Sequence, residues 1–324
     1  MSYTLRAIFP ALCLTLILPC SQLVMAADLA PSKDAKPAEA PVERAALPTR
    51  SEEDTLALER QVPQAEQQQL QAGEETFLAL WKPANVDEAK GAVIIVPGAD
   101  ESADWPVAVG PLRRKLPDVA WSSLSLSLPD AHNDGIFARA ADAPAAAVTG
   151  DKPKDAAAKT PDPAASAEAQ AAVDAEQAAI QADQAKANAE KIFARIDSAV
   201  AFAQQNKARS IVLLGHGSGA YWAARYMSER PSPAIQRLVM VTAVDTGKET
   251  PSLMELLPTV KVPTADFVNK DRSVPRQQAQ DRLDASKRSK NAKFTQVALS
   301  AIPGNPTMEQ DQLFRRVRGW LEGQ

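Results

Sequence analysis

Short apolar runs alternate with segments of helical periodicity along most of the chain. Seven runs have the composition or the alternation of β-strands, and they span residues 75–81, 91–97, 120–128, 210–215, 237–243, 264–269 and 294–300. Helical patterns fall between most of them, at residues 106–116, 165–205, 220–229, 252–257, 276–287 and 308–322. Strands separated by helices pair in parallel through right-handed crossovers. The pattern therefore predicts an α/β fold, a three-layer α/β/α sandwich with a mostly parallel sheet.

The helical pattern at residues 165–205 is long and rich in alanine and glutamine. It contains no glycine or proline, and its residues lose little entropy in a helix. Its first half carries only Val173 and Ile180 among the alanines, whereas its second half has an apolar face formed by Ile192, Ile196, Val200 and Phe202. We therefore expect only the second half to pack against the sheet.

The first 26 residues have the layout of a secretory signal peptide, in which Arg6 precedes a short apolar run and a small-residue exit. We expect cleavage after Ala26 and export to the periplasm, with a retained membrane anchor as the alternative. Residues 27–50, rich in Ala, Pro, Lys and Glu, then predict a disordered tether. Residues 51–324 form the predicted domain, interrupted by an Ala-rich disordered and helical insertion at residues 138–190.

Composition excludes several kinds of function. The formal net charge is −4 without a basic patch, so nucleic acid is not an expected partner. Both cysteines, Cys13 and Cys20, lie in the signal segment, so the mature chain would contain no disulfide and no thiolate. The two histidines, His132 and His216, are too isolated to predict a metal site. No cofactor is predicted, and no later run is apolar enough to span a membrane.

Candidate chemistry lies in the stretch IVLLGHGSGAYWAARYM, which has the pattern of a strand, a sharp turn and a helix. A Gly-x-Ser-x-Gly nucleophile elbow needs small residues two positions before and after its strained apex. Gly215 and Gly219 meet this requirement around Gly217. An apex at Ser218 would instead place His216 at a crowded position. The sequence therefore predicts an apex without a side chain, and Ser218 as a residue that caps the following helix.

A catalytic serine also needs a base, which in such a fold follows the last strand, and an acid that orients the base. No histidine follows His216 in the chain, so this late position holds no imidazole. Asp271 follows a strand at the position of the acid, and Asp245 is a second candidate, but each is also typical of a turn or a helix cap. His132, in the loop after the third major strand, could enter a pocket or simply be solvated.

The chain resembles the α/β-hydrolase superfamily, and most closely a family of exported bacterial proteins of unknown function (DUF3530-like), over most of residues 69–324. The resemblance is carried by Pro97-Gly98, Asp104-Trp105-Pro106, Leu128-Pro129-Asp130, the Gly-His-x-x-Gly turn and the terminal RVRGWL. It implies an oxyanion hole of backbone N–H groups near Ala99 and Ser218. The superfamily's elbow serine and late histidine are replaced here by Gly217 and by a loop near Gly304 and Asn305.

These observations favour a periplasmic α/β-hydrolase-like pseudoenzyme that lacks a complete catalytic triad and acts in binding or envelope assembly. Its partner would be an envelope protein or a small ligand. The alternative is a serine esterase or related acyl hydrolase that uses Ser218, with His132 as a non-standard base and Asp271 as the acid. In either case the turn and the oxyanion region comprise Gly98, Ala99, Gly215, Gly217 and Gly219. A carrier of a small ligand in the residual pocket is a third hypothesis.

Overall fold

The computed structural model describes residues 48–130, 163–244, 251–291 and 293–323. In the long helix at residues 163–205, side chains are described from residue 175 on. The predicted signal peptide, most of the predicted tether and residues 131–162 of the predicted insertion lie outside the described residues. His132 and Asp245 lie outside them as well, so the structure says nothing about these two candidates.

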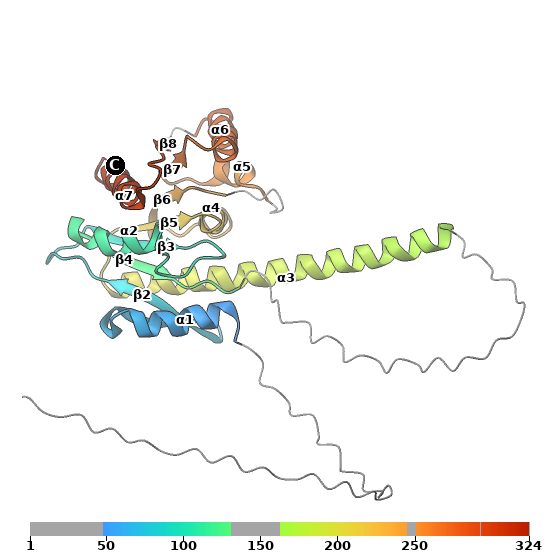
Figure 1. Ribbon diagram of the computed structural model, residues 1–324, viewed down its shortest axis with the longest axis horizontal. Helices are drawn as coiled ribbons and strands as arrows, with labels where there is room; N and C mark the ends of the chain where they lie inside the picture. The colour runs from blue at the N-terminus through green and yellow to red at the C-terminus, as the bar shows by residue number, and fades with distance from the viewer. Residues whose placement is uncertain (1–47, 131–162, 245–250, 292, 324) are drawn as a thin grey trace, which may run out of the picture. The chain divides into compact units, whose positions relative to one another are not determined.

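A single eight-stranded sheet forms the centre of the described chain, in the order β1-β2-β4-β3-β5-β6-β7-β8 (Figure 1). The strands are β1 (Gln67–Ala72), β2 (Glu75–Lys82), β3 (Gly91–Val96), β4 (Trp121–Leu126), β5 (Ile211–His216), β6 (Ile235–Val241), β7 (Thr264–Asn269) and β8 (Phe294–Leu299). β2 pairs antiparallel with β1 and β4, and all the other pairs are parallel. The predicted mostly parallel sheet is confirmed. The strands from β3 to β8 all end at one side of the sheet, which we call the carboxyl edge.

Helices cover both faces of this sheet. They are α1 (Arg50–Gln61), α2 (Val109–Lys115), α3 (Pro163–Gln205), α4 (Gly219–Glu229), α5 (Leu253–Leu256), α6 (Ser273–Arg288) and α7 (Pro306–Glu322). The core on one face joins β-strand residues such as Ile94 to α3 and α4, and the core on the other joins Val93 and Ile95 to α2 and α7. Every residue of β3 is buried, as expected for a parallel strand covered on both faces. The predicted three layers are therefore confirmed.

Two elements were not predicted from the sequence. Helix α1 begins at Arg50, the last residue of the predicted tether, and Thr49 and Glu52 form a capping box at its start. Its Leu58 packs in a small separate core with residues of β2. Strand β1 reads QQQLQA and buries only Leu70. Its extended conformation comes from antiparallel pairing with β2, to which a tight turn at residues 73–74 joins it.

Helix α3 has one exposed part and one packed part. Every side chain of residues 175–187 is exposed. Burial begins at Ala189, and Ile192 and Ile196 are almost fully buried against the sheet. Among the side chains described from residue 175 on, burial starts where the apolar face starts, as expected for a helix whose second half packs against the sheet.

Candidate functional site

The turn between β5 and α4 has its strained position at Gly217. This residue has φ +56°, in the left-handed region that glycine adopts at no steric cost. Its N–H donates to the carbonyl of Val241 at 3.0 Å, and its carbonyl accepts from the N–H of Val244 at 3.2 Å, so the apex is attached to the end of β6. Ser218 follows with φ −70° and ψ −19°, which are helical values. In this structure the apex therefore carries no side chain.

The glycines on either side of the apex stand where a side chain does not fit. A Cβ on Gly219 would lie 2.3 Å from two backbone carbonyl oxygens at the end of β3, and one on Gly215 would lie 2.4 Å from the backbone of α4. A Cβ on Gly217 would meet only Oε1 of Glu101, at an ordinary 3.7 Å. Strand and helix thus approach closely at the flanks of the turn, while the apex has room for a Cβ. This is the spacing that an elbow requires.

The Ser218 hydroxyl binds the loop after β3. Its Oγ accepts a hydrogen bond from the N–H of Ala99 at 2.8 Å. The prediction that Ser218 caps α4 is wrong, because its side chain accepts no hydrogen bond from the first turn of the helix. A capping residue has an extended backbone, which aims its side chain at the next turn, whereas Ser218 is already helical. The hydroxyl therefore accepts the hydrogen bond of the Ala99 N–H, which the resemblance assigned to the oxyanion hole.

His216, the last residue of β5, pairs with Glu101 in the loop after β3. Its Nδ1 lies 2.7 Å from Oε1 and 2.8 Å from Oε2 of that carboxylate, and Oε2 also accepts the N–H of Gly98 at 2.7 Å. The two side chains are only 10% and 14% exposed. Glu101 was missed in the sequence. Its position after a parallel strand next to β5 was the available signal, since loops of adjacent strands meet at the carboxyl edge.

The loop that carries Glu101 rests on a buried ion network. Arg113, only 3% exposed, donates to Asp104 at 3.0 Å and also binds Glu66. Burial raises the pKa of Glu66, but hydrogen bonds and charges of Lys82 and Arg113 outweigh burial, so this pKa lies below its usual value. Asp104 belongs to the Asp-Trp-Pro triplet of the sequence, which therefore anchors the loop beneath the turn.

Asp271 does not contact the turn. Its Oδ2 accepts the N–H of Ala301, in the loop after β8, at 2.6 Å, and its own N–H donates to Asn269 at 3.0 Å. The loop after β7, where the fold would place its acid, is therefore joined to the loop after β8, where it would place its histidine, by a hydrogen bond from the Ala301 N–H to the Asp271 carboxylate. Within the described ranges, no hydrogen bond joins the Ser218 hydroxyl to an imidazole.

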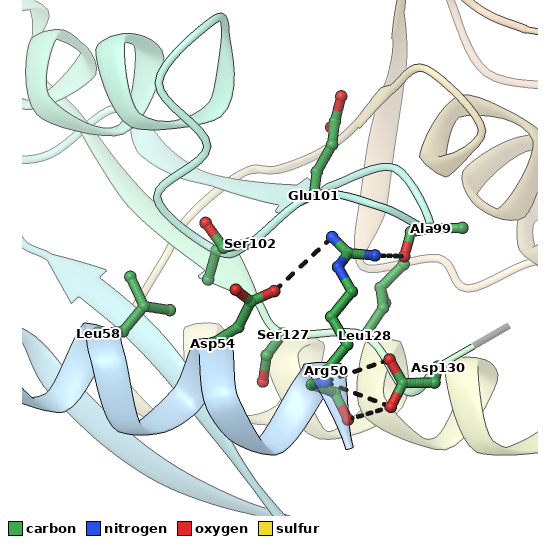
Figure 2. A pocket seen from close by; sticks show the side chains of 11 residues that line it. Arg50, Asp54, Leu58, Ala99, Glu101, Ser102, Ser127, Leu128 and Asp130 are labelled. Atoms are coloured by element: carbon green, nitrogen blue, oxygen red, sulfur yellow. Dashed lines mark hydrogen bonds and ion pairs between the residues drawn. The ribbon is translucent and has the colours of Figure 1, made fainter. Parts of the chain in front are cut away.

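A small pocket lies next to Ala99, between α1 and the ends of β3 and β4 (Figure 2). Arg50 donates to the carbonyl of Ala99 at 3.2 Å and to Asp100 at 2.9 Å. The hydroxyl of Ser51 donates to Asp130 at 2.7 Å. These bonds hold the first turn of α1 against both loops, and the cavity left to a water-sized molecule measures about 10 Å³. That volume is about the size of one water molecule.

The described residues contain neither a metal-binding cluster nor a membrane-spanning helix. No group of three or more His, Cys, Asp and Glu side chains lies close enough together there to hold an ion. No helix in the same ranges has both the length and the apolar character needed to cross a bilayer.

Comparisons with known proteins support the fold. The model of a family described as protein of unknown function (DUF3530) matches residues 9–323, and curated proteins give no match. An esterase of Pyrococcus furiosus is 12% identical over 79% of this chain and 89% of its own, with a TM-score of 0.51. A dienelactone hydrolase of Anabaena variabilis is 14% identical over 80% and 98%, with a TM-score of 0.50. Likeness at these identities shows the α/β-hydrolase fold and nothing finer.

Proposed function

Since the chain belongs to the DUF3530 family and has an α/β-hydrolase fold, we propose that it uses this fold for binding and does not hydrolyse esters. The observation that carries the proposal is the side-chain-free apex at Gly217. Acyl transfer in this fold starts with attack by a nucleophile at that position. Glycine has no atom that could form the acyl intermediate.

The contact between Ser218 and Ala99 supports the same proposal. An oxyanion hole works by presenting free N–H donors to the charge that develops in the transition state. Here the N–H of Ala99 already donates to the serine hydroxyl at 2.8 Å. Loss of one such donor lowers kcat by about 100-fold to 1,000-fold in serine hydrolases. The site is thus short of an apex nucleophile and of one free oxyanion donor.

One observation favours a second candidate, a serine esterase that uses Ser218. Glu101 holds Nδ1 of His216 at 2.7 Å, the arrangement by which a carboxylate orients a catalytic imidazole. The similar solved structures are named esterase and dienelactone hydrolase. For this activity the Ser218 hydroxyl would have to leave Ala99 and reach an imidazole nitrogen, of His216 or of His132.

Ester hydrolysis distinguishes the two candidates. The full chain is incubated at high concentration with p-nitrophenyl acetate and butyrate, alongside Ser218→Ala and His216→Ala. The control is Ser102→Ala, which removes a hydroxyl from the loop after β3, next to Glu101 in the small pocket beside Ala99. We expect one background rate for all four proteins, without saturation. A saturable wild-type rate that Ser218→Ala abolishes and Ser102→Ala leaves unchanged would establish the esterase instead.

The binding half of the proposal rests on α3. Residues 175–187 form more than three helical turns of exposed side chains in the described structure, including Ile180. This exposed surface is the one to which the proposal assigns the envelope partner. A photo-cross-linking amino acid at Ile180 should give a discrete adduct in the native cells, while the same group at Leu56, equally exposed on α1, should not. Absence of an adduct at Ile180 would remove the support for α3 as the contact.

Export to the periplasm is part of the proposal and rests on residues 1–26 alone. Cleavage after Ala26 predicts a mature protein that begins at Ala27 and is released with the periplasmic fraction. Mass spectrometry of the N-terminal peptide tests it. A cytosolic protein that keeps residues 1–26 would contradict it.

A further inference from the structure

Exposed apolar side chains gather at the carboxyl edge of the sheet. Val107, in the connection after β3, is 58% exposed, Val274 after β7 is 65% exposed, and Met308 after β8 is 44% exposed. Val244 and Met254, in the connection after β6, are exposed as well. Each of these connections leaves a parallel strand at the same edge of the sheet. One edge of the domain therefore presents apolar side chains from four loops.

Hydrogen bonds join three of these loops into one surface. The side chain of Gln310, in the first turns of α7, donates to the carbonyl of Pro106 at 2.9 Å. The N–H of Ile302, after β8, donates to Glu309 at 2.6 Å. The bond between Asp271 and Ala301 attaches the loop after β7 to the loop after β8. Val107, before α2, and Val274 and Met308, in the first turns of α6 and α7, therefore lie on connections that hold one another in place.

Unpaired cations surround the most exposed of these side chains. Lys270 and Arg272 precede Val274, and Arg276 follows it within the first turn of α6. All three are exposed, and none forms an ion pair with a residue that the structure describes. By comparison, Arg225 and Arg230 pair with carboxylates. Asp271, between Lys270 and Arg272, carries one negative charge at the same point. The three cations therefore leave a net positive charge available to an outside partner.

We propose that this surface docks the protein peripherally on a bilayer that contains anionic lipid. We call it the carboxyl-edge rim, formed by Val107, Val274, Met308, Lys270, Arg272 and Arg276. Interfacial binding needs apolar side chains that insert among the lipid headgroups and neighbouring cations that attract anionic lipid. A bilayer satisfies both along a flat surface, which matches a rim built from several connections at one edge of the sheet.

Vesicle flotation tests the proposal. The full chain is mixed with vesicles of phosphatidylcholine, with and without phosphatidylglycerol. Each Lys or Arg near an anionic surface strengthens binding by about fivefold, so Lys270→Gln, Arg272→Gln and Arg276→Gln together should weaken it roughly a hundredfold. A control of equal charge change at the opposite edge, Lys261→Gln, Arg288→Gln and Lys290→Gln, should bind like the wild type. Equal binding to neutral vesicles, equal loss in both variants, or no binding at all overturns the proposal.

A local probe separates the rim from any membrane affinity of residues 1–26. In a chain with Cys13 and Cys20 replaced by serine, an environment-sensitive fluorophore is attached at Val274→Cys or, as control, at Val86→Cys. Val86 is 47% exposed and precedes β3 at the opposite edge. Anionic vesicles should shift the emission to the blue at position 274 and leave position 86 unchanged. A blue shift at both positions, or at neither, contradicts docking through the rim.

Discussion

Substituting the turn glycines one at a time should separate the apex from its flanks. In Gly219→Ala the new Cβ lies 2.3 Å from two backbone oxygens of the segment that ends β3. Neither oxygen can rotate away, so strand and helix must move apart. Gly217→Ala adds its Cβ 3.7 Å from a flexible carboxylate and clashes with nothing. Its cost comes from the φ of +56° alone.

The magnitudes differ enough to be measured. A left-handed conformation costs alanine about 1–2 kcal/mol, and the lower chain entropy of unfolded alanine returns about 0.4–1 kcal/mol. We therefore expect Gly217→Ala to lower the free energy of unfolding by about 0.5–1 kcal/mol. Overpacking into a well-packed core costs about 1–3 kcal/mol, and more where backbone must move, so Gly219→Ala should lose about 3 kcal/mol or fail to fold.

Urea unfolding followed by tryptophan fluorescence and circular dichroism measures both variants against the wild type, and coincident transitions test for two-state behaviour. Gly215→Ala should resemble Gly219→Ala, because its Cβ also meets backbone. Equal losses in all three variants would mean that the apex is as crowded as its flanks. A harmless Gly219→Ala would refute the register of the turn.

Three further predictions concern stability. Asp266→Asn should cost about 3–5 kcal/mol, because it leaves the buried Arg282 without its anionic partner at 2.9 Å. Glu229→Gln, which breaks the partly exposed pair with Arg225, should cost under about 1 kcal/mol, and similar losses of the two variants in urea unfolding would contradict this. The lowered pKa of Glu66 means that its ionised form stabilises the fold above its unfolded pKa, near 4.5, and that this stability is lost as the pH falls through the folded pKa. Glu66→Gln should therefore be less stable at neutral pH and lose less on acidification; parallel stability profiles of the two proteins would refute this. Thr49→Ala removes the cap of α1 and should lower the thermal midpoint by an amount equivalent to about 1 kcal/mol, and an unchanged midpoint would show that α1 unfolds separately.

The sheet could be predicted from the sequence because its parallel strands are buried on both faces and read as continuous apolar runs. Strand β1 and helix α1 have no such runs. β1 depends on its pairing with β2. α1 packs through Leu58, and Val62 directly after the helix packs in the same core, which is too few apolar positions to give a periodic signal. The capping box at Thr49 was the local sign of α1.

The turn could be predicted only in part. Three glycines in alternate positions place the strained residue at Gly217, because close approach at the flanks excludes any larger side chain. The hydrogen-bond partners of His216 and Ser218 lie in the loop after β3, more than a hundred residues earlier in the chain. The bonds from Glu101 to His216 and from Ala99 to Ser218 are therefore tertiary contacts that local pattern does not encode.

Intact-mass spectrometry after incubation with a fluorophosphonate probe tests the absence of a nucleophile most directly. The side-chain-free apex and the serine held by Ala99 predict that the mass of the folded wild-type protein stays unchanged, while a known serine hydrolase in the same tube gains one phosphonyl group. A stoichiometric gain by the wild type that Ser218→Ala abolishes would contradict the account.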